Sequence, residues 1–177
     1  MSTTTVVIGA APCGLSTVAR LKAFGLHVRV CGSPMARWAA NMPEGVLLKP
    51  PPSASVLSAP KSGFTLDAYA RQAGERQLEG HDPVPVEMFV RYRRWFAEQL
   101  VPEVENIRAL GVDRQADGFY LTLAPGQELR TSAVVVASGM DGFAYVPEPL
   151  AALVPEGRGD ARQRSWSPRT ERNWSLS

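Results

Sequence analysis

The amino-acid sequence predicts an α/β domain in which a parallel sheet is joined to an antiparallel β-meander. The first observation is an apolar, β-branched run at residues 3–8, which leads into a turn of small residues and then a helical pattern. The second is a pair of turn signals, Asp-Gly at 117–118 and Pro-Gly at 125–126, on either side of an alternating strand. The third is another apolar run at residues 133–137. Such runs are typical of parallel strands that are covered on both faces.

Residues 3–31 predict a strand, a helix and a second strand. Pro12 suits the first turn of a helix, where its missing N–H costs nothing, and Gly25 lies where a helix commonly ends. Apolar residues recur at helical spacing between these two positions. Residues 26–31 then alternate apolar and polar side chains, which favours a strand. A strand–helix–strand unit of about 30 residues is the βαβ unit of parallel sheets.

Residues 32–80 have a weaker pattern. The run Pro50-Pro51-Pro52 predicts neither a helix nor an interior strand, and Ser, Ala and Gly are frequent around it. A long stretch without secondary structure is uncommon inside a compact domain and is usually functional. We therefore expect an insertion that lies over a bound ligand, with one short helix at residues 64–72.

A longer helix is predicted between Pro85 and Pro102. Its large apolar side chains fall on one face, namely Phe89, Tyr92, Phe96 and Leu100. This stripe predicts packing into the core. Arg91, Arg93 and Arg94 are expected on the other faces of the helix.

The remaining strands form the predicted meander and complete the sheet. A strand is expected at residues 106–113, and two more at 119–123 and 128–131, separated by the turn signals. Residues 133–137 predict a further buried strand, and Ser-Gly follows it at 138–139.

Composition and charge limit the class of protein. The 177 residues carry a formal net charge of +2, which is too small to argue for nucleic acid or an acidic membrane surface as a partner. No apolar run reaches the roughly 18 residues that cross a bilayer, and the first residues lack the basic side chains of a secretory signal. Cys13 and Cys31 form no disulfide framework, which favours reduced thiols in a cytoplasmic protein. A redox or catalytic Cys13 is the alternative.

The sequence changes in character near residue 155. Residues 1–155 hold fourteen Lys and Arg against fourteen Asp and Glu, whereas residues 156–177 hold five Arg against three acidic residues. The second stretch is rich in Arg, Ser and Trp and has neither a helical nor a strand period. We expect one domain over residues 1–155 and a disordered tail over residues 156–177.

Residues 9–14, Gly-Ala-Ala-Pro-Cys-Gly, lie between the first predicted strand and helix and predict a dinucleotide site. Backbone N–H groups and the positive end of the helix meet there, where a diphosphate can bind. Gly9 is expected to make the tight turn, and Gly14 to allow close packing of helix on strand. Ala11 stands where the pattern G-x-G-x-x-G has its second glycine, so we expect weaker binding than glycine would give.

A second check of this pattern fails. An acidic residue is expected at the end of the second strand, where it would hold the ribose hydroxyls, but residues 30–33 read Val-Cys-Gly-Ser. Ser33 can form a hydrogen bond with a ribose, although a weaker one than a carboxylate forms. The alternative is that the fold persists while the nucleotide site has decayed.

The segment Ala137-Ser138-Gly139 resembles the Ala-Thr-Gly signature that closes the FAD domain of two-dinucleotide-binding flavoproteins. Ser138 keeps the hydroxyl, and Gly139 keeps the bare backbone that passes the flavin nucleotide in that family. Residues 35–49 and 83–96 resemble the stretch after the second strand and the helix that follows it. Over about residues 4–155 the chain resembles the N-terminal FAD-binding portion of class B flavin-dependent monooxygenases, which include the flavin-containing and N-hydroxylating types.

The resemblance implies a three-layer, Rossmann-like FAD-binding domain with a parallel sheet and an antiparallel β-meander. It implies FAD as the cofactor and NADPH as the reductant. It also implies a second glycine motif for NADPH, which is not found in this sequence, so we expect no turnover by the chain alone. The change of composition at residue 156 favours a natural truncation or a frame-shifted product. Surface left by the absent domains predicts self-association, and the substrate stays open.

The residues expected to bind the cofactor are Gly9, Ala11, Pro12, Cys13, Gly14, Ser33, Trp38, Ser138 and Gly139. Trp38 either stacks near the flavin or fills the core. No catalytic residue can be nominated, and His27 and His81 lack partners at the spacing of metal ligands, so no metal site is expected. Two other functions stay open. One is a non-catalytic module that binds NAD(P) or ADP without flavin, and the other is a folded remnant that acts only through protein contacts.

Overall fold

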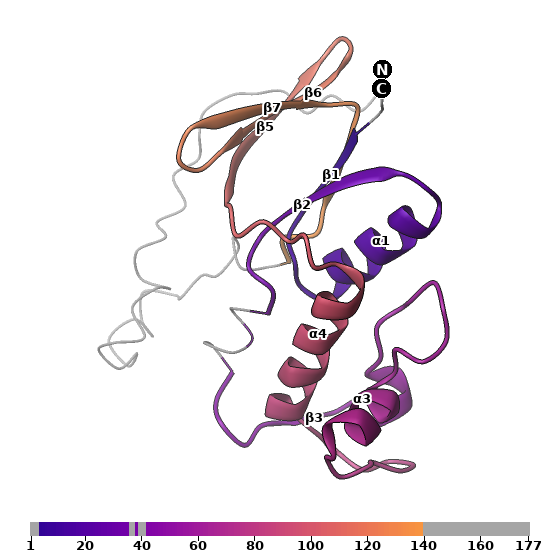
Figure 1. The fold of residues 1–177 in the computed structure, drawn as a ribbon. Helices are drawn as coiled ribbons and strands as arrows, with labels where there is room; N and C mark the ends of the chain where they lie inside the picture. The colour runs from indigo at the N-terminus through magenta and orange to yellow at the C-terminus, as the bar shows by residue number, and fades with distance from the viewer. Residues whose placement is uncertain (1–3, 36–37, 39–41, 140–177) are drawn as a thin grey trace, which may run out of the picture. The chain divides into compact units, whose positions relative to one another are not determined.

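The computed structural model describes residues 4–35, 38 and 42–139, which form an α/β arrangement (Figure 1). Its elements in chain order are β1 (Thr4–Ile8), α1 (Pro12–Ala23), β2 (His27–Cys31), β3 (Leu47–Leu48), the 3₁₀ turn η1 (Pro52–Ala54), α3 (Leu66–Ala73), β4 (Val84–Pro85), α4 (Val86–Leu100), β5 (Ala109–Gln115), β6 (Gly118–Leu123), β7 (Gln127–Thr131) and β8 (Ala133–Val136). The predicted domain boundary at residue 155 and the predicted tail at 156–177 lie outside the described residues.

The first strand of the chain is the central strand of the parallel sheet. Within the described residues the order is β2-β1-β8, with Thr5 beside both Val28 and Ala133. Val6 and Val7 of β1 are fully buried, which confirms the prediction of a strand covered on both faces. The prediction of a buried last strand is wrong in part. β8 is an edge strand among the described residues, so its side chains are only half-buried and Val136 is 67% exposed.

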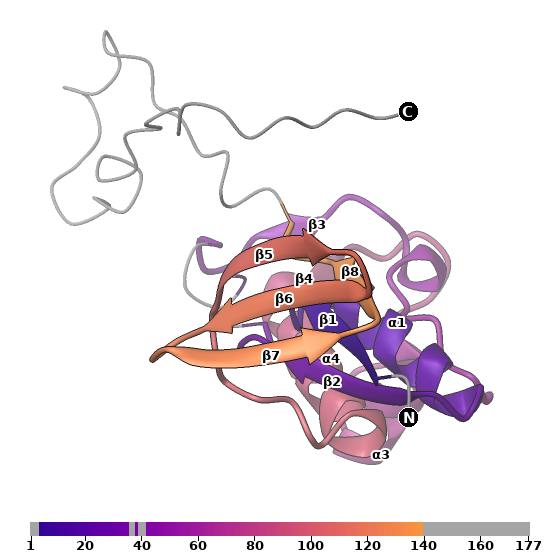
Figure 2. The same ribbon diagram turned by 90° about the horizontal axis from the view of Figure 1, so that it is seen from above.

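The parallel sheet is the middle of three layers, because successive side chains of its strands point to opposite faces. Val7, Val30 and Val135 pack with α1 and α4 in one apolar cluster. Val6 and Val134 instead pack with Leu121 and other side chains of the meander. Figure 2 shows the meander lying across the parallel sheet, with the helices beyond it. The predicted three-layer architecture is therefore confirmed, because the period-two pattern of each strand sends successive side chains to opposite layers.

Helix α1 begins and ends where the sequence predicts. Pro12 is its first residue. At its other end, the N–H groups of residues 24–26 donate hydrogen bonds to carbonyls of the last turn. Leu15 and Val18 are fully buried against the sheet. The helix therefore lies on β1 with its N-terminal end at the carboxyl end of that strand (Figure 1), the place where α/β folds bind ligands.

The segment between residues 42 and 85 has more structure than predicted. The expected helix is present as α3, and β3 pairs with β4 in an antiparallel bridge, Leu47 opposite Pro85. The proline run does not exclude a helical turn, because Pro52 is the first residue of η1, where a missing N–H costs nothing. The expectation of one long unstructured insertion is therefore wrong for the described part of this segment.

Helix α4 carries the largest buried side chains of the core. Tyr92 and Phe96 are fully buried, which confirms the predicted packing of the aromatic stripe. The Tyr92 hydroxyl donates to the Phe64 carbonyl at 2.8 Å and accepts from the Leu57 N–H at 2.9 Å, so it ties α4 to the preceding segment. Arg93 was expected on a face other than that of the apolar stripe, but it is only 5% exposed. The expectation for Arg93 is wrong, since it lies one turn after Phe89, beside the buried stripe.

The meander is confirmed, with β5-β6-β7 in antiparallel order. Its first strand begins at Ala109, three residues later than predicted. The residues before it have another role. The Glu105 N–H donates to the Val30 carbonyl, and the Gly32 N–H donates to the Glu105 carbonyl, so this segment lies parallel to the end of β2.

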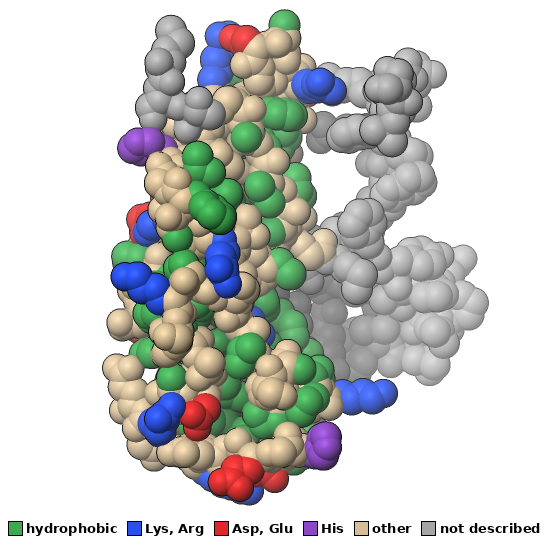
Figure 3. Space-filling model, turned by 90° about the vertical axis from the view of Figure 1, so that its right-hand side faces the viewer, with side chains coloured by type: hydrophobic (Ala, Val, Ile, Leu, Met, Phe, Trp, Pro, Cys, Tyr) green, Lys and Arg blue, Asp and Glu red, His purple; other side chains and the backbone are tan. Residues whose placement is uncertain are grey.

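The surface carries charges of both signs. On the face shown in Figure 3, Lys and Arg side chains alternate with Asp and Glu side chains and with apolar side chains. Among the described helices, none combines the length and the apolar character needed to cross a bilayer.

Candidate functional site

The turn between β1 and α1 has no room for side chains at two positions. Gly9 has a φ of +111°, and a Cβ there would lie 2.3 Å from the Ala137 carbonyl oxygen. A Cβ on Gly14 would lie 1.8 Å from the Gly9 carbonyl oxygen. Gly9 therefore permits the tight turn and Gly14 the close packing, as the pattern predicts. Ala11 is half-buried, with an extended backbone, at the N-cap of α1.

The two glycine-containing segments meet although about 130 residues separate them. β8 pairs with β1, and the Ala137 N–H donates to the Ile8 carbonyl at 2.7 Å, so residues 137–139 leave the sheet beside the glycine turn. Ser138 and Gly139 are exposed, and Gly139 has a φ of +71°. The predicted site residues at the two ends of the domain therefore lie together.

The start of α1 offers unpaired backbone donors. The first hydrogen bond of this helix runs from the Leu15 N–H to the Ala11 carbonyl at 3.0 Å. Within the described residues, no side chain caps the helix, and no acidic residue lies in its first turn. The N–H groups of Cys13 and Gly14 therefore have no partner within the helix, and the positive end of the helix dipole is not neutralised locally. Cys13 is exposed there, whereas Cys31 is buried.

The end of β2 carries a neutral pair in place of the expected acid. Ser33 is exposed, and its hydroxyl donates to the Asn106 side-chain oxygen. Asn106 was not among the predicted site residues. The preceding Glu105 is engaged elsewhere, because Arg29 donates to it at 2.5 and 2.8 Å. This ion pair lowers the pKa of the Glu105 carboxyl and raises the pKa of the Arg29 guanidinium.

Trp38 packs on the core from the segment after β2. Its ring centroid lies 5.1 Å from that of Phe89 of α4, and its side chain is half-buried. It therefore contacts the core, one of the two roles predicted for it. Its contact with a flavin stays a prediction.

Arg93 is a charged residue near this site that sequence reasoning missed. Its guanidinium lies 3.9 Å from the centre of the Phe89 ring. Burial lowers its pKa to about 10. The sequence did contain a signal, since Arg93 is four residues after Phe89 and three before Phe96, the spacing of one helical face.

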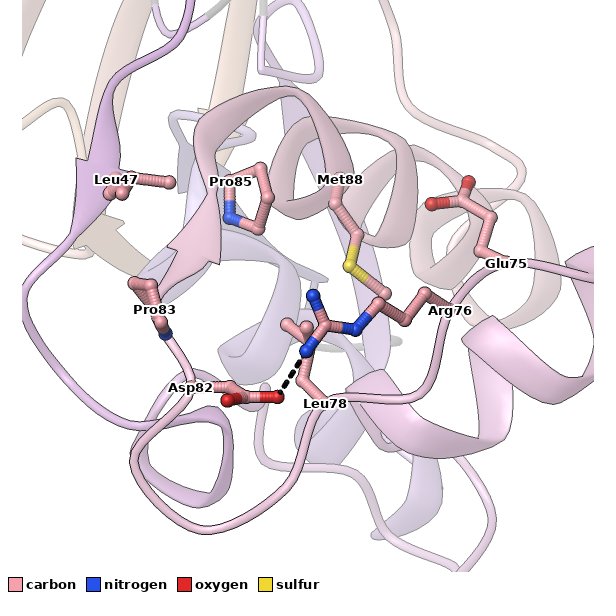
Figure 4. Close-up of a pocket in the computed structure, with 8 residues that line it drawn as sticks. All are labelled: Leu47, Glu75, Arg76, Leu78, Asp82, Pro83, Pro85 and Met88. Carbon is pink, nitrogen blue, oxygen red and sulfur yellow. Dashed lines mark hydrogen bonds and ion pairs between the residues drawn. The ribbon is translucent and has the colours of Figure 1, made fainter.

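Other features of the described residues lie apart from the glycine turn. Two surface hollows of about 300 and 460 Å³ share Leu78 and Met88. Figure 4 shows the smaller, where Arg76 and Asp82 form an ion pair of 3.0 Å beside these apolar side chains. Neither hollow is lined by a predicted cofactor residue. In the part of the chain that the structure describes, no group of three His, Cys, Asp or Glu could hold a metal.

Comparison with known proteins agrees with this geometry. A family model described as FAD-NAD(P)-binding matches residues 6–141, and the chain belongs to this family. The match begins in β1 and ends after Gly139, so it includes both glycine-containing segments. FAD and NAD(P) are therefore the cofactors of its family. A comparison with curated protein sequences gives no match.

Solved structures share the fold. A flavin-containing monooxygenase from Stenotrophomonas maltophilia has 22% identity, a TM-score of 0.66, and a match over 82% of this chain and 41% of its own. A bacillithiol disulfide reductase from Staphylococcus aureus has 16% identity, a TM-score of 0.61 and coverages of 77% and 38%. A lysine monooxygenase from Nocardia farcinica has 16% identity and a TM-score of 0.58, with a match over 75% of this chain and 43% of its own. The chain thus spans about two fifths of the length of these proteins, and at such identities the likeness establishes the fold.

Proposed function

We propose that this chain binds FAD and is the cofactor-holding part of an NAD(P)H-dependent flavoprotein oxidoreductase of the monooxygenase type. The observation that carries this proposal is the meeting of the glycine turn with residues 137–139, where Gly9 faces the Ala137 carbonyl. In the flavoproteins that this chain resembles, a segment with a bare backbone passes the flavin nucleotide at this position, and Gly139 supplies such a backbone here.

The residues of this site fit a dinucleotide. The first turn of α1 presents N–H groups and a positive dipole to a diphosphate. Side chains are absent where the backbone approaches most closely, at Gly9 and Gly14. The residues proposed to hold the cofactor are Gly9, Ala11, Pro12, Cys13, Gly14, Ser33, Trp38, Ser138 and Gly139. Bound FAD would supply the redox chemistry, while these residues bind and orient it.

Flavin content of the purified protein tests this proposal. We expect a yellow protein that releases FAD on denaturation, or a colourless one that regains flavin absorbance after incubation with FAD. A colourless protein that FAD cannot reconstitute would overturn it. Alkylation of thiols adds a local readout, because FAD is expected to protect Cys13, which is exposed at the helix start, while the buried Cys31 stays unmodified in both states.

A second candidate is a module that binds NAD(P) or ADP without flavin. The Ser33–Asn106 pair, which replaces the carboxylate expected at the end of β2, favours it. Competition separates the two candidates. If ADP and NADP⁺ bind as tightly as FAD, the flavin contributes nothing and the second candidate holds. If FAD binds at least tenfold more tightly than ADP, the isoalloxazine end makes contacts of its own.

The sequence contains one motif of the G-x-x-x-x-G kind after a strand, so we propose that reduction by NADPH requires a site beyond those described. Addition of NADPH to the FAD-loaded chain under anaerobic conditions is expected to leave the flavin absorbance unchanged. Bleaching of that absorbance would contradict this part of the proposal.

We also propose a reducing, cytoplasmic location, because Cys13 and Cys31 are both free thiols. The proposed ligand is a small-molecule cofactor rather than nucleic acid.

We further propose that the chain self-associates through exposed apolar side chains. Val136 on β8 is 67% exposed, and Leu110 on β5 is 58% exposed. Both lie on edge strands among the described residues, and such edges favour association. Size-exclusion chromatography over a range of concentrations tests this, with Val136→Asp expected to shift the protein toward the monomer. A concentration-independent monomer would contradict it.

A further inference from the structure

Arg93 of α4 is a buried cation whose Nε lacks an acceptor among the described residues. The residue is 5% exposed, and its Nε has no hydrogen-bond partner in the described part of the chain. Its nearest partners are aromatic rings, that of Phe89 at 3.9 Å and that of Tyr92 at 5.7 Å. Among the residues that the structure describes, no carboxylate affects the pKa of Arg93. A buried charge supported only by aromatic faces is costly in free energy.

This guanidinium belongs to a helix that packs against the start of α1. The two helices are in contact, and Figure 1 shows the N-terminal end of α1 beside α4. Cys13, in the first turn of α1, is among the groups near enough to affect the pKa of Arg93. Phe89, on which Arg93 stacks, also contacts Trp38 from the segment after β2. The Phe89 ring therefore has both the Arg93 guanidinium and Trp38 as neighbours, on a helix that contacts α1.

Two positive features therefore lie on helices that are in contact with each other. The first turn of α1 has no acidic residue and no side-chain cap within the described residues, and Arg93 lacks an anionic partner there. A helix N-terminus and a guanidinium repel each other at low dielectric. An anion bound between them would offset both the buried charge of Arg93 and the repulsion between the guanidinium and the helix N-terminus.

We infer that Arg93 and the first turn of α1 together form an anion subsite that takes the diphosphate of the nucleotide cofactor, with the guanidinium binding phosphate oxygens from the α4 side. This inference rests on the proposed function, to which it adds a residue of α4. A diphosphate fits better than a carboxylate because the planar guanidinium and the row of N–H groups can each bind separate phosphate oxygens.

Three variants test this inference. Arg93→Met removes the charge and keeps an apolar chain of similar length, Arg93→Lys keeps the charge without the planar fork, and Arg94→Met is the matched control at an exposed position of the same helix. Binding of FAD is measured by quenching of flavin fluorescence. Loss of a charge-assisted hydrogen bond predicts a dissociation constant raised about tenfold to a hundredfold in Arg93→Met. We expect an intermediate value in Arg93→Lys and a change of less than about twofold in Arg94→Met.

Thermal unfolding of the FAD-free proteins separates binding from folding. Because Arg93→Met removes an unpaired buried charge, it is expected to raise the unfolding midpoint of the FAD-free protein by about 2–4 °C while weakening FAD binding. A midpoint that falls together with FAD binding would overturn the inference and make Arg93 a residue that stabilises the fold. FAD binding within twofold of the wild type in Arg93→Met would overturn it as well.

Inorganic pyrophosphate distinguishes failure of this inference from failure of the proposed function. If the wild-type chain binds no FAD, the proposed function is wrong. The subsite is then supported if millimolar pyrophosphate raises the unfolding midpoint of the wild type and of Arg94→Met but not of Arg93→Met. No pyrophosphate effect on that wild-type chain would overturn the subsite as well.

Discussion

Individual glycines decide whether the nucleotide turn can form. Gly14 is the more demanding of the two in the turn, because its missing side chain leaves room for the Gly9 carbonyl, which belongs to backbone and cannot rotate away. At the same scale, Arg93 and Ser33 show that the polar groups near the turn differ from the acidic pattern of dinucleotide sites.

Gly14→Ala is expected to destabilise the domain and to abolish FAD binding. A Cβ 1.8 Å from the Gly9 carbonyl oxygen forces α1 away from β1, which we expect to lower the free energy of unfolding by about 3 kcal/mol or more. Urea unfolding with FAD titration measures both effects. Gly111→Ala is the control, since a Cβ there has no neighbour within 4 Å. Equal stability of the two variants would contradict the steric account.

At the scale of elements, hydrogen bonds from single side chains connect segments that the local pattern leaves unconnected. Tyr92 joins α4 to the segment before it, and Glu105, which accepts from Arg29, joins β2 to the segment before β5. Both connections hold the elements that border the proposed site.

Tyr92→Phe is expected to lower the free energy of unfolding by about 1–3 kcal/mol, because the Leu57 N–H and the Phe64 carbonyl lose their partner in a buried region. Chemical denaturation measures the change. The matched control is Tyr120→Phe on the meander, where the hydroxyl interacts with the exposed Glu128 side chain rather than with buried backbone, and we expect a change within about 0.5 kcal/mol. A loss for Tyr92→Phe no larger than for the control would show that water replaces the lost bonds.

Glu105→Gln is expected to destabilise the protein at pH 7 and to have no effect in acid. Hydrogen bonds from Arg29 hold the Glu105 pKa below its ordinary value of 4.5 in the folded state. The unfolded chain therefore binds a proton before the folded one does, so the stabilisation is complete above pH 4.5 and is lost as the pH falls through the folded-state pKa. We expect about 1 kcal/mol at pH 7 for this partly exposed pair.

Unfolding free energies of the wild type and Glu105→Gln, measured from pH 7 down to pH 3, check this expectation. The Glu103→Gln variant is the control, because Glu103 pairs with Lys22 at a more exposed position. A difference between wild type and Glu105→Gln that is independent of pH would show that the carboxylate charge does not contribute.

The elements that the sequence predicted well are those whose signals are local. The strand, glycine turn and helix of residues 4–23 follow from the spacing of apolar residues together with Pro12 and Gly9. The meander follows from the alternation of apolar and polar residues and from the turn residues between its strands. The burial of Arg93 was missed because a charged side chain is buried only when tertiary packing covers it, which the local pattern of one helix does not show. The Ser33–Asn106 contact was missed because the two residues are 73 positions apart.

At the scale of the whole described domain, cofactor binding at the proposed site is coupled to the free energy of unfolding. The site is built from β1, α1, β2 and β8, which belong to the central sheet and its helical layer. A ligand that binds here binds only the folded chain, so it must stabilise the domain as a whole rather than a local segment.

FAD at a hundred times its dissociation constant is expected to raise the free energy of unfolding by about 2.7 kcal/mol. Denaturant unfolding with and without FAD measures this, with riboflavin, which lacks the diphosphate, as the matched control expected to give a much smaller effect. A stabilisation by riboflavin equal to that by FAD would show that the diphosphate turn does not contribute to binding.

The position of β1 between β2 and β8 has a consequence for synthesis of the protein. The glycine turn leaves the ribosome well before Ala137, whose carbonyl borders it in the folded protein. The nascent chain therefore carries the first half of the nucleotide cradle, with an open edge along β1, until the last described strand emerges and docks. Cofactor capture in the cell must then follow translation of residue 139, and an interruption of translation before β8 would release a chain with half a site.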